Sequence, residues 1–369
     1  MEAMRTVNVN VASHPYPVMI DSGLLARTGD VLREIYPDRD RVVIVTVAPV
    51  RKLWGELLTG SLDKAHFAHV VVEMPDGERH KTLATVGDLA AKIVRRGADR
   101  KTVILALGGG VVGDVAGFLA SIYMRGIDVI QLPTTFLAQV DAAIGGKTGV
   151  DLPAGKNLLG TFHHPRAVII DPAVLATLPE REYRSGLYEA LKCGIIRRRD
   201  IFEYMEQNRE RILQRDPDAL DWLISESVQV KADVVAADER EGNLRRILNF
   251  GHTVGHALEA ETGYKQFLHG EAVAWGMVAA SMIAAAMQKT DSETARRIIS
   301  AVLAYAPLPK VEPRGKKIVR RLSTDKKTLD GVVHFVLPVE VGKVEIVSEV
   351  PERAVVQAVE ELRYLSQVG

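Results

Sequence analysis

The first half of the chain alternates apolar segments with amphipathic ones, and this alternation constrains the fold more than any other feature. Segments that are apolar throughout are typical of strands in a parallel sheet, because helices cover both of its faces. The predicted strands of this kind cover residues 41–47, 69–73, 102–107 and 127–132, with helical patterns at 50–58 and 81–96. We therefore expect a doubly wound α/β arrangement with a mostly parallel sheet. An antiparallel strand pair is predicted ahead of it, over residues 6–11 and 16–20.

The pattern changes near residue 178. Beyond it the apolar residues recur mainly at helical spacing, and the next strand candidate is at 332–337. The predicted helices cover residues 181–196, 199–213, 217–238, 244–261, 269–288 and 292–304. We predict two domains, an α/β domain over residues 1–178 and a mainly α-helical domain over residues 179–369.

Composition argues against several classes of function. Lys plus Arg and Asp plus Glu are equal at 47 each, so no overall positive charge favours nucleic acid. The longest apolar run, at 272–287, is shorter than the roughly 20 residues that cross a membrane, and it predicts a buried core helix. Cys193 is the only cysteine, which excludes an internal disulfide. With no secretion signal expected at the N-terminus, we predict a cytoplasmic protein that binds neither nucleic acid nor membrane.

A glycine-rich loop follows the predicted strand at 102–107. Residues 108–113 read GGGVVG and satisfy the pattern GxGxxG, with a helix predicted at 114–122. Glycines at such a turn let the backbone approach a phosphate, which the helix N-terminus attracts. The pattern alone is weak, since a tight turn that packs a helix closely has the same glycines, and no acidic residue clearly ends a following strand. We favour a Rossmann-like site for a pyrophosphate-bearing nucleotide.

Three of the ten histidines lie within 18 residues of the second half. His252 and His256 are four residues apart, so on a helix both project from one face. His269 opens the very apolar segment that follows. Neutral imidazole is a common metal ligand, and the cluster therefore favours a metal site. The alternative is one core histidine and two that cap helices.

Longer blocks of the sequence resemble a known family. Residues 108–160 read GGGVVGDVAGFLASIYMRGIDVIQLPTTFLAQVDAAIGGKTGVDLPAGKNLLG. Further blocks are GLYEALKCG at 186–194, RRILNFGHTVGHALE at 245–259, LHGEAVAWGM at 268–277 and DKK at 325–327. Together they resemble the 3-dehydroquinate synthases, sugar-phosphate cyclases of the shikimate pathway in aromatic amino acid biosynthesis. The resemblance runs from about residue 40 to 340, whereas the glycine loop alone is shared with polyol dehydrogenases.

The resemblance implies a bound NAD and a divalent metal, with zinc favoured and cobalt as an alternative. It implies conversion of 3-deoxy-D-arabino-heptulosonate 7-phosphate to 3-dehydroquinate and phosphate. Glu189, His252 and His269 are the implied metal ligands. Spacing alone favours His252 and His256 as a ligand pair, whereas the resemblance keeps His256 for the substrate. One carboxylate and two imidazoles leave open positions, as a catalytic zinc requires.

The resemblance also implies which residues meet the substrate. Those for its phosphate and nearby hydroxyls are Arg125, Lys147, Asn157, Asn249, His256 and one of Lys326 and Lys327. Lys231 and Arg245 would bind its carboxylate, since a guanidinium can pair with two oxygens at once. Asp141, Lys192 and Glu241 would lie near the reacting hydroxyls.

The implied NAD positions lie in several loops. They are Asp76, Gly77, Glu78, Arg79, His80 and Lys81; Gly110, Val111, Val112, Gly113 and Asp114; Thr134, Thr135, Lys147 and Lys156; and Val174, Leu175, Ala176 and Thr177. One position departs from the family, which often has Asp or Asn where this chain has Val47. Valine cannot accept a hydrogen bond from the adenosine ribose, so this position does not support a preference for NAD over NADP.

Three other functions are alternatives. A metal-dependent polyol or glycerol dehydrogenase oxidises uncharged alcohols and does not need Lys147, Asn157, Arg245 and the DKK lysines together. A catalytically silent nucleotide-binding protein is disfavoured because the implied metal ligands and Lys192 are all present. A sister cyclase for another sugar phosphate is the third. We expect transient oxidation by NAD, phosphate elimination, reduction, ring opening and aldol closure, in a homodimer in which Arg125 reaches a neighbour's site.

Overall fold

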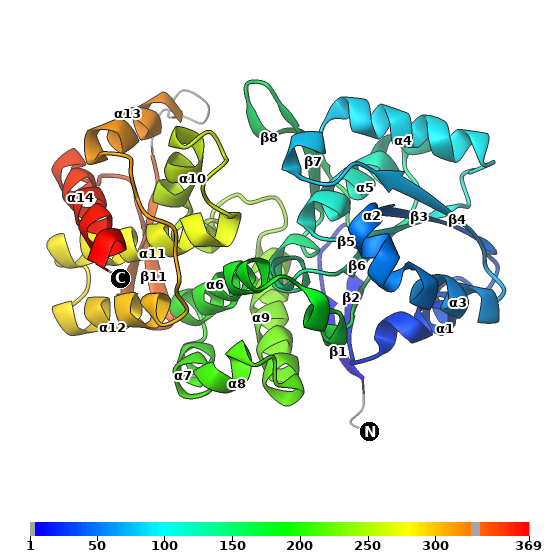
Figure 1. Cartoon of the computed structure of the whole chain (residues 1–369), viewed down its shortest axis with the longest axis horizontal. Coiled ribbons are helices and arrows are strands. Elements are labelled where there is room, and N and C mark those ends of the chain that lie inside the picture. The colour runs from blue at the N-terminus through cyan, green and yellow to red at the C-terminus, as the bar shows by residue number, and fades with distance from the viewer. Residues whose placement is uncertain (1–3, 326–332, 369) are drawn as a thin grey trace. The chain divides into compact units, whose positions relative to one another are not determined.

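The chain forms two compact units in the computed structural model, which describes residues 4–325 and 333–368 (Figure 1). One unit comprises Met1–Pro179 and Pro217–Arg240, and the other Glu180–Asp216 and Glu241–Gly369. The first segment of the first unit ends at Pro179, next to the predicted boundary at residue 178. The division differs from the expected single domain over 179–369, because α9 (Pro217–Ala237) belongs to the first unit. α9 packs against the first two strands of that unit, and a helical pattern does not reveal which core a helix joins.

A seven-stranded sheet forms the centre of the first unit, in the order β1-β2-β9-β6-β5-β3-β4. Its strands are β1 (Arg5–Val9), β2 (Tyr16–Ile20), β3 (Arg41–Val47), β4 (Ala68–Met74), β5 (Val103–Gly108), β6 (Val129–Pro133) and β9 (Ala167–Ile170). Neighbouring strands pair in parallel except β1, which is antiparallel to β2. The predicted mostly parallel sheet is confirmed.

Helices cover both faces of this sheet (Figure 1). α4 (Leu83–Arg95) and α5 (Gly110–Ile122) share one core with the sheet. α1 (Thr28–Ile35) and α3 (Glu56–Lys64) share the core on the other face, and α2 (Ala48–Val50) leads into α3. β3 and β5 are buried on both sides, which is why their sequences are apolar throughout.

The strand order places the glycine loop at a switch point of the sheet. β3 lies between β4 and β5, so the chain passes from β3 to β4 on one side and to β5 on the other. In open parallel sheets, ligands bind outside the carboxyl ends of the strands at such a point. Residues 108–110 lie there, at the end of β5. Val47 ends the neighbouring β3, and its side chain is buried in the core.

A hairpin that we did not predict covers β7 (Lys147–Leu152) and β8 (Gly155–Phe162). In its antiparallel register Gly149 lies opposite Gly160. A Cβ on Gly160 would lie 2.2 Å from the backbone oxygen of Thr148, so the two strands need glycine there. Glycine-rich strands carry little of the apolar alternation that marks a strand in sequence.

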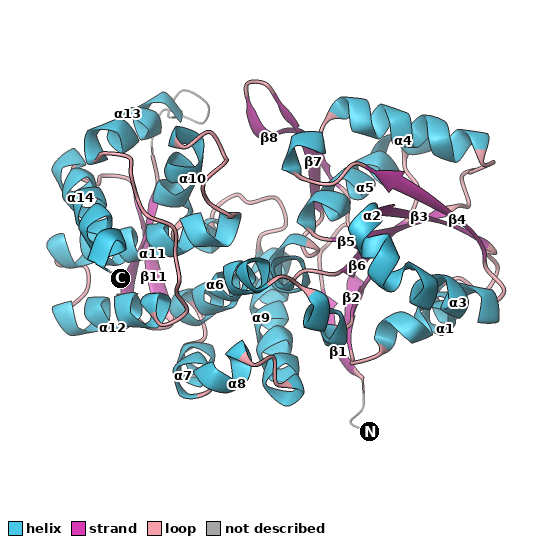
Figure 2. Cartoon of the chain, in the orientation of Figure 1, coloured by secondary structure: helices cyan, strands magenta, loops and turns pink. Residues whose placement is uncertain are grey.

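The second unit is mainly helical (Figure 2). Its helices are α6 (Glu180–Ile196), α7 (Arg199–Gln207), α8 (Arg209–Leu213), α10 (His252–Glu261), α11 (His269–Ala286), α12 (Ser292–Leu303), α13 (Gly315–Asp325) and α14 (Glu352–Val368). β10 (Phe335–Glu340) and β11 (Lys343–Val347) form a two-stranded sheet. α11 packs against α6, α10, α12, α14 and β10, which explains the apolar run at 272–287. Within the described ranges, no helix combines the length and apolarity that a membrane crossing needs.

Candidate active site

Glu189, His252 and His269 converge within the second unit, although they lie on three different helices. Glu189 belongs to α6, and the two histidines are the first residues of α10 and α11. The Nε2 atoms of His252 and His269 lie 4.0 and 3.8 Å from Oε1 of Glu189. Atoms that bind one zinc ion at about 2.1 Å lie within about 4.2 Å of one another. Both imidazole nitrogens are therefore within this limit of the carboxylate oxygen, which is compatible with a shared ion.

Close packing of glycines brings these helices together. A Cβ on Gly276 of α11 would lie 1.8 Å from the backbone oxygen of Gly251, the residue before His252. Gly251 has a φ of +81°, a left-handed conformation that glycine adopts without strain. A Cβ on Gly270 would lie 1.8 Å from the backbone oxygen of Ser185 in α6. Larger residues at these contacts would separate α10 and α6 from α11, and with them Glu189, His252 and His269.

The second ring nitrogen of each histidine has a partner of its own. Nδ1 of His252 lies 3.1 Å from the backbone oxygen of Phe250, and Nδ1 of His269 lies 3.4 Å from Oε2 of Glu259. When Nδ1 donates to these oxygens, Nε2 of each ring has its lone pair available on the side of Glu189. Histidines that bind metals typically have such an oxygen partner on the other nitrogen.

Sequence reasoning missed Glu259. It lies at the seventh position after His252, so on a helix the two residues share a face. That spacing was a signal in the sequence, but glutamates on helices are usually solvated, and nothing in the pattern indicated that this one is buried.

The two imidazoles differ in their affinity for protons. Burial, and then the charge of Lys192, lowers the pKa of His252 well below its ordinary value of 6.5, so the ring is neutral near pH 7, as a metal ligand must be. Burial also lowers the pKa of His269, but the hydrogen bond and charge of Glu259, with the charge of Glu189, outweigh burial and raise that pKa. A cation that binds His269 must therefore displace a proton more often than at His252.

The carboxylate of Glu189 suits a cation. Its side chain is 1% exposed, and neither oxygen accepts a hydrogen bond from a described residue. The Lys192 ammonium, equally buried, forms an ion pair with one of them. A buried carboxylate with unused acceptor capacity is costly unless a further positive group binds it. The donor set of one carboxylate and two imidazoles is one that zinc and similar divalent ions accept.

Other predicted residues of the second unit lie close to this cluster in sequence or in space. The exposed His256 belongs to the histidine cluster, in which one nitrogen of each ring lies within 4.8 Å of the others. Arg245 is fully buried in the turn η7 (Leu244–Asn249). Asn249 donates from Nδ2 to Oε1 of Glu241 at 3.3 Å. Lys326 and Lys327 lie outside the described residues.

In the first unit, the glycine loop leads directly into α5. The helix begins at Gly110, earlier than the predicted 114, so the first turn of α5 contains the loop's own glycines. A Cβ on Gly113 would lie 2.8 Å from Oε1 of Gln131, and one on Gly109 would lie 3.0 Å from Thr135. The backbone N–H groups at this helix start have no side chain in front of them from Gly109 or Gly110, which fits the approach of a phosphate.

Lys81 lies at the centre of a polar cluster in the same unit. Its buried ammonium contacts Oδ2 of Asp114 and Oδ1 of Asn157, each at 2.5 Å. Burial lowers the pKa of Lys81, but the charges of Asp114 and Glu78 outweigh burial and raise that pKa. Asn157 has a φ of +56° and donates its backbone N–H to Asp151 at 2.8 Å. The structure thus joins two predicted NAD positions and one predicted substrate residue.

The remaining predicted residues of the first unit lie on turns and on the hairpin. Lys231 of α9 donates to Oδ1 of Asp141 at 2.6 Å, and Lys156 of β8 forms an ion pair with Glu78 at 3.4 Å. Arg125 is exposed in the turn after α5. Residues 76–81 follow β4, Thr134 and Thr135 follow β6, residues 174–177 lie in η6 (Pro172–Thr177), and Lys147 begins β7.

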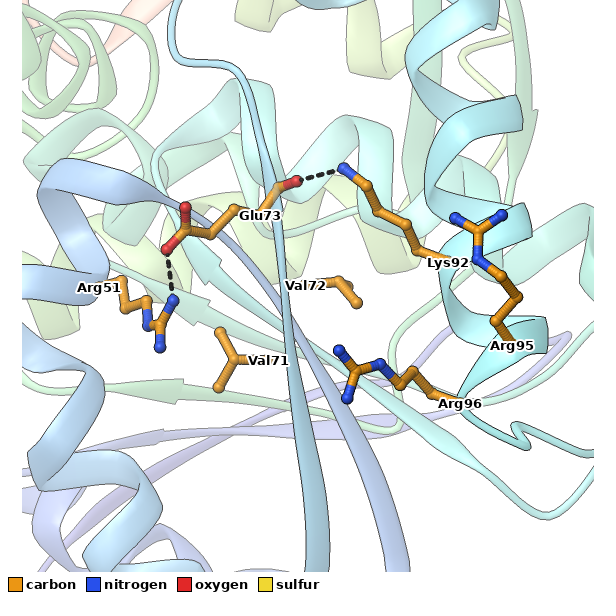
Figure 3. A pocket seen from close by; sticks show the side chains of 7 residues that line it. All are labelled: Arg51, Val71, Val72, Glu73, Lys92, Arg95 and Arg96. Carbon is orange, nitrogen blue, oxygen red and sulfur yellow. Dashed lines mark hydrogen bonds and ion pairs between the residues drawn. The ribbon is translucent and has the colours of Figure 1, made fainter.

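A pocket of about 320 Å³ lies beside β4, the edge strand of the sheet, and none of the predicted site residues lines it (Figure 3). Arg51, Val71, Val72, Glu73, Lys92, Arg95 and Arg96 line it. Arg51 pairs with Glu73 at 2.8 Å, and Lys92 donates to the backbone oxygen of Glu73 at 3.1 Å. Lys92 and Arg95 lie in the last turn of α4, where the helix dipole favours cations. These local interactions account for Arg51, Lys92 and Arg95 without a ligand.

Comparison with solved structures places the fold in a class. A 2-epi-5-epi-valiolone synthase from Streptomyces hygroscopicus subsp. jinggangensis 5008, solved with NAD+ and Zn2+, is 30% identical with a TM-score of 0.87, over 99% of each chain. A 2-deoxy-scyllo-inosose synthase complexed with carbaglucose-6-phosphate, NAD+ and Co2+ is 26% identical with a TM-score of 0.86, over 97% of this chain and 99% of that one. Glycerol and alcohol dehydrogenases at 14–16% identity share the fold alone. The class is therefore that of the sugar-phosphate cyclases.

Sequence comparison identifies the family within this class. The models of the 3-dehydroquinate synthase N-terminal and C-terminal parts match residues 71–185 and 186–328. A 3-dehydroquinate synthase of Koribacter versatilis (strain Ellin345) is 61% identical over 366 residues, which is 99% of this chain and 100% of the relative. The chain belongs to the 3-dehydroquinate synthase family.

Proposed function

We propose that the protein converts 3-deoxy-D-arabino-heptulosonate 7-phosphate to 3-dehydroquinate and inorganic phosphate. Membership of the family supports this function, and the convergence of Glu189, His252 and His269 is the structural observation that carries it. Three ligands from three helices leave coordination positions open for substrate oxygens, which is the arrangement of a catalytic metal rather than a structural one.

The second unit would hold a divalent cation through these three residues, and the first would hold NAD. The glycine loop and the first turn of α5 are the proposed seat of the pyrophosphate. When bound, the cation makes a substrate hydroxyl more acidic, and NAD takes a hydride from its carbon and later returns it. We favour zinc, and the Co2+ of the 2-deoxy-scyllo-inosose synthase makes cobalt the alternative.

The charged side chains would bind and orient the substrate. Lys192 is buried beside Glu189, and its ammonium would donate to the reacting hydroxyl oxygen and stabilise negative charge there. Arg245 and Lys231 would bind the carboxylate. The exposed ring of His256 would donate a hydrogen bond to the phosphate, as would the side chains of Lys147 and Asn157.

No single side chain is needed as the base for phosphate elimination. The departing phosphate of the substrate can itself take the proton from the adjacent carbon, so that the C–H bond and the C–O bond to phosphate break together. This fits a site with many predicted phosphate binders. The residues then act by holding the phosphate in the geometry in which its oxygen reaches that proton.

A phosphate-release assay with simultaneous absorbance at the NADH band tests the proposal. With NAD bound, phosphate should be released while no NADH accumulates, and a chelator should stop release. Glucose 6-phosphate, which lacks a carboxylate, is the control substrate and should not turn over. NADH produced in proportion to turnover would reassign the protein to the dehydrogenases, and turnover of glucose 6-phosphate alone would reassign it to another cyclase.

We also propose that the protein acts as a homodimer in the cytoplasm. Family resemblance supports the dimer, in which Arg125 would reach the neighbour's site. Light scattering at micromolar concentration measures the oligomeric state, and a monomer with full activity would contradict this proposal.

A further inference from the structure

Glu259 is a second carboxylate beside the three proposed metal ligands. Its side chain is 3% exposed, and its Oε2 lies 3.4 Å from Nδ1 of His269. Carboxylates are almost never buried to this extent unless they are paired or hydrogen-bonded. The contact with Nδ1 of His269 is an interaction of this kind, and it joins Glu259 to one of the proposed metal ligands.

The contact determines which nitrogen of His269 faces Glu189. A carboxylate can only accept a hydrogen bond, so the proton of a neutral ring is held on Nδ1. Nε2, 3.8 Å from Oε1 of Glu189, is then the nitrogen with the lone pair. If the proton were on Nε2 instead, the ring would present N–H to the place where a cation would lie.

The two histidines achieve this orientation by different means. Nδ1 of His252 lies 3.1 Å from the backbone oxygen of Phe250, which is fixed by the turn before α10. His269 begins α11, and the partner of its Nδ1 is a side chain of α10. The orientation of His252 is therefore local, whereas that of His269 depends on one residue of a neighbouring helix.

We propose that Glu259 is a positioning residue, which holds the Nδ1–H form of His269 and turns its Nε2 toward the cation shared with Glu189 and His252. Its negative charge also favours a divalent cation at this place over the empty site. The inference rests on the proposed metal site. It adds a residue that does not touch the cation but determines how tightly the cation is held.

Two substitutions separate the hydrogen bond from the charge. Glu259→Gln keeps the shape and an oxygen that can accept from Nδ1, and it removes the charge. Glu259→Leu keeps similar volume and removes both. Loss of such a partner typically weakens metal binding by about 10- to 100-fold. We expect Glu259→Leu to show a loss of this size in a zinc titration against a competing chelator, with Glu259→Gln between it and the unchanged protein.

Glu261→Gln is the matched control. Glu261 lies at the end of the same helix and pairs with Lys317 at 3.5 Å and Arg321 at 3.8 Å, away from the histidines. This variant should bind zinc as tightly as the unchanged protein. Visible absorption of the Co2+-substituted protein gives a second measurement, because the intensity and position of its bands report ligand geometry. A merely structural role for Glu259 would leave these bands unchanged.

His269→Ala distinguishes failure of this inference from failure of the proposed metal site. If His269→Ala loses zinc while Glu259→Leu and Glu259→Gln bind it with unchanged affinity and unchanged Co2+ bands, the role of Glu259 is refuted and the site stands. If His269→Ala retains one equivalent of zinc with unchanged affinity, the ligand assignment itself fails. Should Glu259→Leu not fold, Glu259→Gln and its Co2+ bands still decide the question.

Discussion

Gly276→Ala should both destabilise the second unit and weaken cation binding at the proposed metal site. Gly276 lies in the middle of α11, where alanine is normally preferred over glycine by about 1 kcal/mol. The added Cβ would lie 1.8 Å from the backbone oxygen of Gly251, 2.7 Å from its carbonyl carbon and 2.9 Å from the backbone nitrogen of Gly255. All three neighbours are backbone atoms of one short stretch, so rotation of a side chain cannot relieve the clash.

The size of the effect follows from this geometry. Ordinary van der Waals contact for a Cβ begins at 3.4 Å, so α10 and α11 must move apart by about 1.5 Å. Overpacking of this kind typically costs 1–3 kcal/mol, and the contact with rigid backbone places this case at the upper end. After subtracting the helix preference for alanine, we expect the free energy of unfolding to fall by about 2 kcal/mol.

The same movement carries His252 away from Glu189, because His252 directly follows Gly251. Displacements of about 1 Å cost roughly 100-fold in catalytic rate in other sites, and we expect metal affinity to fall by about tenfold or more. Denaturant unfolding and zinc titration measure the two effects.

Gly87→Ala is the control, since Gly87 lies inside α4 with nothing within 4 Å of a new Cβ. This variant should have unchanged or higher stability. Unchanged stability and unchanged zinc affinity in Gly276→Ala would refute the packing argument.

Three further outcomes are expected. Removal of the metal with a chelator should lower the free energy of unfolding of the second unit. The expected loss is about 2.7 kcal/mol relative to protein with the cation at 100 times its Kd. Equal denaturant midpoints with and without chelator would contradict a cation site in the folded protein. Ser13→Ala should lower the free energy of unfolding by about 0.2–0.5 kcal/mol at pH 7, because its hydrogen bond to Glu239 is exposed and solvent weakens it. That hydrogen bond lowers the pKa of Glu239 from its ordinary 4.5, so the stabilisation is present above pH 4.5 and lost as the pH falls through the lowered pKa. A difference in stability that persists at pH 2 would contradict the reasoning. Lys231→Ala should lower kcat/KM by about 100-fold or more with unchanged NAD binding, and a steady-state assay with a cofactor titration checks both.

The sequence predicted strands best where both faces of the sheet are covered. Residues 41–47 were predicted as a strand and form β3 with the same bounds, because every position after the first is buried. The hairpin of β7 and β8 was missed, since its glycines serve a close approach of two backbones rather than an apolar face. Residues 199–213 were predicted as one helix, but α7 and α8 meet at Asn208, where φ is −109°. A local apolar pattern does not report such a break.

The proposed metal site could be predicted only in part from spacing. The pattern of two histidines four apart indicated a cluster, but it favoured His252 and His256, and resemblance to a family was needed to exchange His256 for His269 and to add Glu189. The structure places His252 and His269 within 4.0 Å of one Glu189 oxygen. This proximity depends on glycine contacts between helices far apart in sequence. Such contacts cannot be predicted from the spacing of residues along one helix, and only the tertiary structure reveals them.

The ion pair of Glu189 and Lys192 is best explained by chemistry rather than by stability. Both side chains are 1% exposed, and a buried ion pair can typically be replaced by apolar residues of similar volume at no cost or with a gain of about 1–4 kcal/mol. We expect the double variant Glu189→Leu, Lys192→Met to be at least as stable as the metal-free protein. Lys192→Met alone should lose about 3–5 kcal/mol, because it leaves a buried carboxylate uncompensated. Chemical denaturation in the presence of chelator measures both. If the double variant is as unstable as the single one, the pair contributes to folding. If the double variant is stable, the two buried charges lower the stability of the fold, and their role is then in the proposed binding of cation and substrate.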